Sequence, residues 1–345
     1  DEYYIEAGIS HSNGSTTAVT LPKTVSGGAM FRLKRTDSAG SWYMFDTVLG
    51  DDVFNLLDTP SVEDSSTWSD QTSSGTTLTL PSALASGTYL LEVFYVGIYF
   101  QIKAWTGTTA AQTVAWDTEL DNELGMLTNV QRSVAGSPVV YHKSLASGSV
   151  LFGNAQNIAL AGRGNYSQDP DVTDFRLSAD ATAQDINTNT KTYVAYAWAN
   201  SGPYAFGSYE GNANADGPMI NVGGYAATWL WKYIDGADNW ALHSDQVDSG
   251  YNVTDALLQP STTGAKSAIS TVAHPLIDRV SNGAKLRNSG TQINTAATNI
   301  YGAFGIQPMT DGSINQGRAD GRGSAPLAIA TGGTITLDGN FAINT

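Results

Sequence analysis

A pattern of about one hundred residues occurs three times in this chain, and this repeat constrains the fold more than any other feature. The third copy contains the run TWLWKYIDGADNWALH, with Lys232 and Trp240. The first copy matches it at a shift of 198 residues in the run MFRLKRTDSAGSWYMFD, where Lys34 and Trp42 take the equivalent places. An apolar alternation, a lysine, an Asp-containing turn and a tryptophan therefore recur in the same order.

The second copy keeps less of the pattern. It is shifted by 96 residues from the first and retains an Ala-Gly-Ser turn and the apolar pair Val140 and Tyr141. Pro138 stands where the other two copies have tryptophan. We therefore expect this copy to share the fold of the others but to lack their core tryptophan.

An aromatic strand closes each copy, at residues 88–96, 192–200 and 298–306. Alternation with period two is the strand signal, because successive side chains point to opposite faces of a sheet. Large aromatic side chains dominate the energetics of protein cores. We interpret one aromatic residue from each closing strand and the two repeated tryptophans as the structural core of the repeat: Phe94, Trp198, Phe304, Trp42 and Trp240.

The repeat length indicates the fold class. Periods of 20 to 50 residues are typical of solenoids and propellers, whereas about 100 residues is the size of a β-sandwich. The 36 glycines and 10% aromatic residues favour short strands and turns over helices. We predict an all-β chain of three tandem, jelly-roll-like β-sandwich repeats at 1–97, 98–203 and 204–307, linked like beads on a string.

The pattern stops after Pro308. Residues 309–322 are rich in Gly, Asp and Asn, which predicts a linker. Two short alternating runs around Gly332 and Gly333 predict a C-terminal β-hairpin. An isolated hairpin is marginally stable, so we expect this one to pair with an edge strand of its own chain or of a neighbour and to serve in assembly.

Charge and composition exclude several function classes. Seventeen basic and 32 acidic residues give a net charge of −15, which repels phosphate backbones and anionic membranes. No segment approaches the roughly 20 apolar residues of a membrane span, and the absence of cysteine excludes disulfides. The first residue is Asp1 rather than Met, so a removed targeting segment, and with it secretion, stays open.

The repeats resemble a β-rich module found in tail-fibre and other virion proteins of mostly marine tailed bacteriophages. The resemblance covers nearly all of residues 1–307 and is most specific in the third copy, in the runs FGSYEGNANADG, WLWKYIDGADNWALHSD and SNGAKLRNSGTQINTAATNIYGAFGIQP. It implies a non-enzymatic structural protein on the surface of the virion, in contact with other virion proteins and homo-oligomeric, a trimer if it is a fibre. The first expectation is a tail-fibre or adhesin segment that binds a host glycan or protein. A capsid decoration or head-fibre protein is the alternative, and a host-glycan depolymerase is a third.

The residues give little support to catalysis or metal binding. None of the four histidines has metal-ligand spacing. We expect a structural role for His142, at an outward-facing position, because the equivalent residues in the other copies are Asp46 and Ser244. The glycines at 162–164 lack the βαβ context of a nucleotide site.

Carboxylates that could serve a glycosidase or calcium lie in two acidic runs and one turn, where solvated or turn-capping acids are the simpler explanation. We expect no metal and no cofactor. These carboxylates belong to Glu119, Asp121, Glu123, Asp169, Asp171, Asp174, Asp235 and Asp238.

Aromatic residues outside the repeat pattern are the better candidates for ligand binding, because loops at the ends of a sandwich vary without harming its core. Six of them lie in polar or Gly-rich surroundings: Trp68, Trp105, Tyr166, Tyr204, Tyr209 and Tyr251. We favour Tyr166 and Tyr251, followed by Trp105 and Tyr209, as residues that stack on a ligand.

Overall fold

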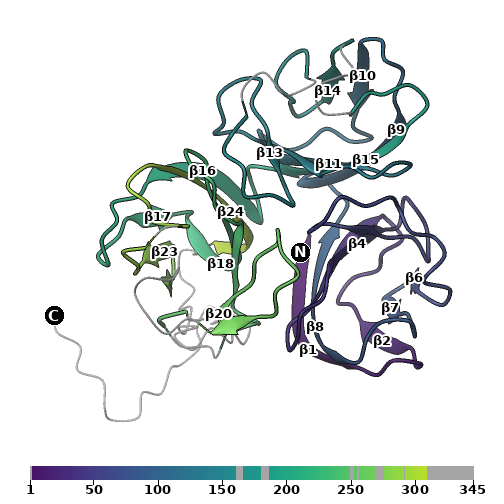
Figure 1. The fold of residues 1–345 in the computed structure, drawn as a ribbon, viewed down its shortest axis with the longest axis horizontal. Helices are drawn as coiled ribbons and strands as arrows, with labels where there is room; N and C mark the ends of the chain where they lie inside the picture. The colour runs from purple at the N-terminus through teal and green to yellow at the C-terminus, as the bar shows by residue number, and fades with distance from the viewer. Residues whose placement is uncertain are drawn as a thin grey trace, which may run out of the picture.

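Three similar β lobes surround a common centre in the computed structural model (Figure 1). The structure describes residues 2–160, 166–179, 186–248, 252–254, 256–268, 276–290 and 292–308. Lobe 1 comprises β1 to β8, lobe 2 comprises β9 to β15 and lobe 3 comprises β16 to β24. Of the predicted linker and hairpin at 308–345, Pro308 is the last residue of β24, and the rest lies outside the described residues.

Lobe 1 is a sandwich of two antiparallel sheets. The larger has the order β1-β8-β3-β4-β5 and the smaller the order β2-β7-β6. The strands are β1 (Tyr3–His11), β2 (Thr17–Thr20), β3 (Ala29–Arg35), β4 (Trp42–Asp46), β5 (Asn55–Leu56), β6 (Thr72–Ser74), β7 (Thr77–Leu80) and β8 (Gly87–Tyr95).

Lobe 2 repeats this topology, with a larger sheet of order β13-β12-β11-β15-β9 and a smaller pair β10-β14. Its strands are β9 (Phe100–Thr106), β10 (Gln112–Ala115), β11 (Leu124–Gln131), β12 (Val139–His142), β13 (Leu151–Phe152), β14 (Asp174–Leu177) and β15 (Thr192–Ala199).

Lobe 3 repeats it again, with sheets of order β16-β24-β18-β19 and β17-β23-β22 and a separate pair β20-β21. Its strands are β16 (Tyr204–Glu210), β17 (Met219–Asn221), β18 (Gly224–Tyr233), β19 (Ala241–Ser244), β20 (Ala256–Leu257), β21 (Ser267–Ala268), β22 (Ile277–Val280), β23 (Gly283–Leu286) and β24 (Thr298–Pro308). The chain is therefore an all-β protein of three β-sandwiches.

Each lobe has an interior of its own between its two sheets. In lobe 1, Tyr89, Leu91, Val93 and Tyr95 of β8 point into this interior. The alternate residues of β8 point the other way, and Phe94 belongs to a different cluster. Both faces of the closing strand are therefore buried, which explains why its sequence is almost continuously apolar.

The fourth cluster lies at the centre and contains residues of all three lobes. The expected arrangement of separate beads is therefore wrong in one respect, because the lobes share a core. Its members come from equivalent positions, such as Met44, Val140 and Leu242 of the fourth strand of each copy. Burying these faces against one another removes the outer face of each larger sheet from water.

Three equivalent aromatic residues meet at the middle of this shared core. The ring centroids of Phe94 and Trp198 lie 5.5 Å apart, those of Phe94 and Phe304 5.8 Å, and those of Trp198 and Phe304 6.3 Å. All three side chains are almost wholly buried. They define the axis around which the three lobes are arranged, and we call them the axial triad.

A second ring of aromatic residues surrounds the axial triad. Tyr3, Phe100 and Tyr204 open the first strand of each lobe and pair in register with Phe94, Trp198 and Phe304, respectively. The Tyr3 ring also lies 6.2 Å from Phe304 of lobe 3. The two rings therefore join the first strand of one lobe to the closing strand of another.

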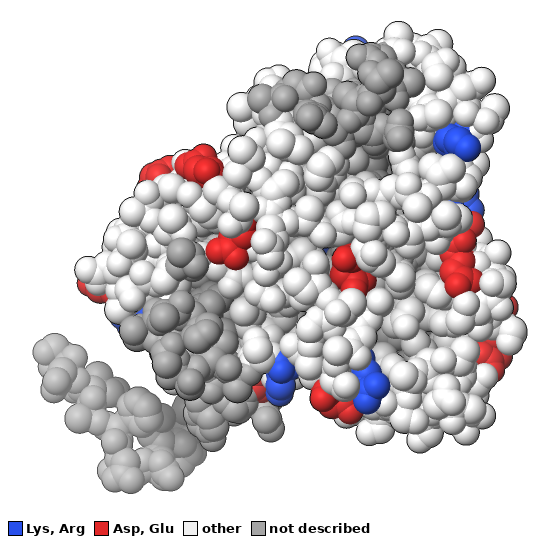
Figure 2. Space-filling model, viewed as in Figure 1, with Lys and Arg blue, Asp and Glu red and all other residues white. Residues whose placement is uncertain are grey.

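Acidic side chains are scattered over the face shown in Figure 2, with fewer basic ones among them. No single patch of one sign dominates this face. This face therefore offers no broad electrostatic footprint for a polyanion.

Replacing Trp198 by Ala should destabilise the whole protein by about 3–5 kcal/mol, because it leaves a cavity where all three lobes meet. Urea unfolding followed by tryptophan fluorescence and circular dichroism should show one coincident transition at lower urea. Ile98→Ala is the control, since Ile98 is 45% exposed and its loss should cost about 0.5 kcal/mol or less. Separate transitions, with lobe 1 unaffected by Trp198→Ala, would contradict a shared core.

Candidate functional site

Tyr166, the preferred aromatic binding residue within the described part of the chain, does not lie in a surface site. Tyr166 was expected in an exposed loop, but it is 9% exposed and packs in the interior of lobe 2. Its hydroxyl accepts a hydrogen bond from the Asn129 amide, and burial raises its pKa. Tyr251 lies outside the described residues.

Trp105 and Tyr209 are half-buried structural residues. The Trp105 ring stacks on Tyr193 at 5.1 Å, and its Nε1 donates to the Ile186 carbonyl. Tyr209 donates its hydroxyl to the Ile293 carbonyl and meets Trp231 edge to face. Trp105 lies in β9 of lobe 2 and Tyr209 in β16 of lobe 3, so these candidates are not brought together.

Six of the eight acidic candidates cap turns or form ion pairs. Asp171 accepts hydrogen bonds from the amides of Thr173 and Asp174, and Asp235 accepts one from the amide of Thr298. Among the described residues, no group of three or more His, Asp or Glu side chains could hold a metal ion. Within that same part of the chain, no helix is long and apolar enough to cross a membrane.

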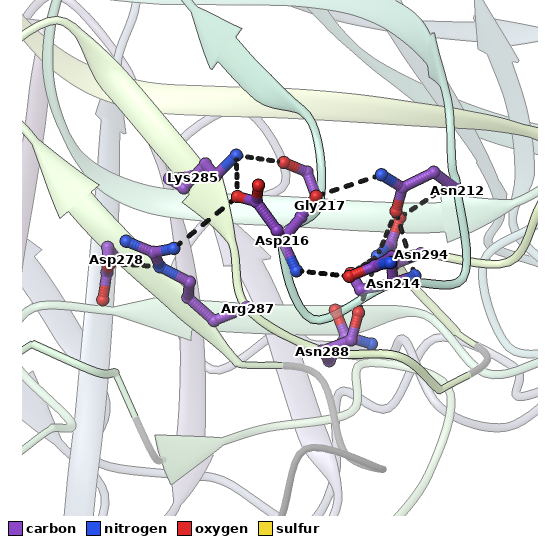
Figure 3. Close-up of polar contacts among 9 residues, drawn as sticks. All are labelled: Asn212, Asn214, Asp216, Gly217, Asp278, Lys285, Arg287, Asn288 and Asn294. Carbon is purple, nitrogen blue, oxygen red and sulfur yellow. Dashed lines mark hydrogen bonds and ion pairs between the residues drawn. The ribbon is translucent and has the colours of Figure 1, made fainter.

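A polar cluster occupies the rim of lobe 3, in the Asn- and Asp-rich loop before β17 (Figure 3). Asn294 fastens this loop, because it accepts from the Asn212 amide and donates to the Asn214 carbonyl. Asp216 pairs with Lys285 of β23 at 2.8 Å. This ion pair is largely exposed and contributes little stability, so the cluster shapes a loop and is not a catalytic centre.

The repeated lysine and tryptophan form a unit that joins lobes. The buried Lys34 donates to the Gly40 carbonyl at 2.5 Å, with its ammonium 5.6 Å from the Trp42 ring centre. Trp42 Nε1 then donates to the Gln259 carbonyl of lobe 3. Desolvation lowers the pKa of Lys34 to about 8.

The same unit recurs in lobe 3. Lys232 donates to the carbonyl oxygens of Tyr233 and Asp238, and Trp240 Nε1 donates to the Phe152 carbonyl of lobe 2 at 2.9 Å. Desolvation lowers the pKa of Lys232, too, to about 8. Two of the three lobe interfaces are thus closed by equivalent tryptophans.

The third interface uses different contacts. Lobe 2 has Val130 and Pro138 where the other lobes have lysine and tryptophan. An Arg132–Glu63 ion pair and a backbone bridge between Ser61 and Gly136 join lobes 1 and 2 instead. The lysine and the tryptophan are therefore absent together, as expected if they act as a unit.

His142 is buried between lobes, so the expectation of an outward-facing position was wrong. Its Nδ1 accepts from the Ser144 amide, which places the proton on Nε2, and Nε2 donates to the Tyr301 carbonyl of lobe 3. The equivalents Asp46 and Ser244 also accept from the amide two residues later. Three different side chains thus cap the same turn, and Asp46 also accepts from Tyr196 of lobe 2.

One buried ion pair lies beside the axial triad. Arg32 and Glu92 are 2.9 Å apart, with side chains 5% and 0% exposed. The Tyr3 hydroxyl donates to Glu92 and accepts from the Thr228 hydroxyl of lobe 3. The equivalent pairs in the other lobes are uncharged: Thr128 with Tyr196, and Leu230 with Gly302.

A cavity of about 240 Å³ lies between lobes 1 and 3. Its walls come from the start of β1, the turn after β19 and the end of β24. The residues that line it are Tyr3, Tyr4, Ile5, Pro203, Ala227, Asp245, Gln246, Gly305, Ile306 and Gln307. It combines apolar and polar side chains, and it is the candidate binding site of the described structure.

Acid should weaken the interface between lobes 2 and 3 through His142. Burial lowers its pKa from 6.5 to about 4, so the unfolded state takes up the proton first, and stability falls as the pH drops from 6.5 to 4. The loss attributable to this group is about 3 kcal/mol. His142→Asn keeps an oxygen for the Ser144 amide without a titrating ring. Urea unfolding at several pH values should therefore show a smaller acid loss in the variant, and equal losses would contradict this role.

Arg32→Leu should cost about 3–5 kcal/mol, because it leaves the Glu92 carboxylate buried without its cation. Adding Glu92→Gln removes that charge and keeps an oxygen for the Tyr3 hydroxyl. The double variant should therefore be clearly more stable than Arg32→Leu alone in urea unfolding. A double variant as unstable as the single one would show that packing, not the unpaired charge, determines the loss.

Comparison with known proteins gives a family and little else. No protein with a curated description matches the chain. Among solved structures, the major capsid protein P2 from Bacteriophage PM2 matches at 9% sequence identity with a TM-score of 0.18, over 58% of this chain and 98% of that chain. A TM-score this low supports no argument about fold or function.

One family covers more than half of the chain. The domain of unknown function DUF7483 matches residues 96–308, a range that contains the strands of lobes 2 and 3. The chain therefore belongs to the DUF7483 family.

Proposed function

We propose that this chain is a non-enzymatic structural component of a bacteriophage particle, displayed on its outer surface as a tail-fibre or adhesin segment that binds the host cell. The repeats resemble the module of such proteins. The observation that carries the proposal is the core shared by three lobes. Such a core holds the loops of all three lobes in one fixed arrangement, and loops on a rigid scaffold are the usual carriers of recognition.

The use of the buried titratable groups supports a structural role. Asp46 and His142 form hydrogen bonds with residues of a neighbouring lobe. Glu92 accepts from the Tyr3 hydroxyl, which also contacts Thr228 of lobe 3. Each is occupied in joining lobes, whereas a catalytic group needs access to substrate. A depolymerase is therefore the least supported of the functions considered.

A capsid decoration protein is the second candidate, and the axial arrangement favours it. One chain already approximates a trimer, with Phe94, Trp198 and Phe304 in equivalent places around an axis. Such a chain fits a threefold position of a shell without two further copies. A fibre would also require three chains to assemble into a trimer. The oligomeric state of the chain therefore distinguishes a fibre segment from a decoration protein.

The location of the chain in the particle tests the proposal. Cryo-electron microscopy of the intact particle should place three-lobed density at the tail periphery. Purified chain added to host cells should then compete with the particles and lower their adsorption. Density spread over the capsid, with no effect on adsorption, would overturn the host-binding function in favour of decoration.

A further inference from the structure

We infer that the cavity between lobes 1 and 3 binds one uncharged sugar unit of a surface glycan. This inference rests on the proposed host-surface function and names its ligand. It is argued from the place of the cavity in the ring of lobes, from the chemistry of its walls and from the charge around it.

The cavity lies at the one lobe interface that no described linking segment crosses. Residues 96–99 link lobe 1 to lobe 2, and residues 200–203 link lobe 2 to lobe 3. These two links pack against each other, because Gly202 of the second lies against the Tyr99 ring of the first. Among the described residues, no segment of this kind joins β24 to β1, and the cavity lies between the end of β24 and the start of β1.

The walls of the cavity have two chemistries. Ile5, Pro203 and Ile306 give an apolar wall, while Asp245, Gln246 and Gln307 give a polar one. Sugars have apolar C–H faces and a rim of hydroxyls, and a few polar groups placed against an apolar wall are the usual way to orient such a ligand.

The polar wall offers both acceptors and donors. Asp245 is 3% exposed, and its carboxylate accepts from Gln246 Nε2 at 3.0 Å and from the Tyr225 hydroxyl at 3.4 Å. The groups that can meet a ligand are therefore the two glutamine amides, each of which has two donors and an acceptor. Gln246 and Gln307 are exposed at the mouth, where their amides can meet sugar hydroxyls as donor or as acceptor.

Charge and size restrict the ligand further. No Lys or Arg lines the cavity, Asp245 lies in its wall, and the whole chain carries −15. Uronic acids, sialic acids and sugar phosphates are therefore disfavoured by like-charge repulsion. The volume of about 240 Å³ is below that of most drug-sized pockets. It suits one sugar unit, with the rest of the glycan outside.

Isothermal titration of the full chain with glucose, galactose, N-acetylglucosamine and glucuronate tests this. At least one uncharged sugar should bind with a dissociation constant of about 1 mM, and glucuronate should not bind. In the double variant Gln246→Ala/Gln307→Ala this binding should weaken about tenfold or more. Val48→Ala is the matched control, because Val48 is the lobe 1 equivalent of Gln246 and is 50% exposed; its binding should be unchanged.

Three results would overturn the inference: equal affinity in the double variant, equal affinity for glucuronate, or no binding of any of the three uncharged sugars. None of them overturns the proposed function, because particle location and adsorption competition test the full chain, whose other loops can also bind the host. Conversely, capsid density with intact sugar binding at the cavity would overturn the host-binding function alone.

Discussion

The contact among Phe94, Trp198 and Phe304 is the interaction on which the rest of the structure depends. Each ring comes from a closing strand that is buried on both faces, one against its own lobe and one against the other two lobes. A strand buried on both faces cannot slip in register without moving polar groups into a core. The axial triad thereby couples the folding of each sandwich to the assembly of the three.

The lobe interfaces show how one geometry accepts different chemistry. Asp46, His142 and Ser244 differ in charge and size, yet each presents an acceptor to the amide two residues later. Trp42 and Trp240 donate to a carbonyl of the next lobe, whereas lobe 2 reaches lobe 1 through Arg132 and a backbone bridge. The backbone arrangement is thus common to the lobes, and the side chains that fasten it are not.

Much of this fold could be predicted from the sequence, because the repeat and the period-two strands are local signals. The shared register of Phe94, Trp198 and Phe304 was also visible. The common core was not predicted from the sequence. The available signal was the closing strand TYLLEVFYV, which lacks the polar alternation of a strand with one face in water. Tyr166 was misplaced because a polar sequence neighbourhood does not reveal that Asn129, 37 residues away, binds its hydroxyl inside the lobe. The cavity could not be predicted, since it depends on how the first and last strands meet.

The fusion of three lobes into one chain has a consequence at Arg32 and Glu92. In a trimer of identical chains, any residue beside the axis appears three times, and three buried arginines around one point would repel each other strongly. Here the equivalent places hold Thr128 and Leu230, so the charge occurs once. Because the three lobes belong to one chain, equivalent residues beside the axis need not be identical. A mutation can therefore change one lobe at the centre while the equivalent residues of the other two lobes keep the packing.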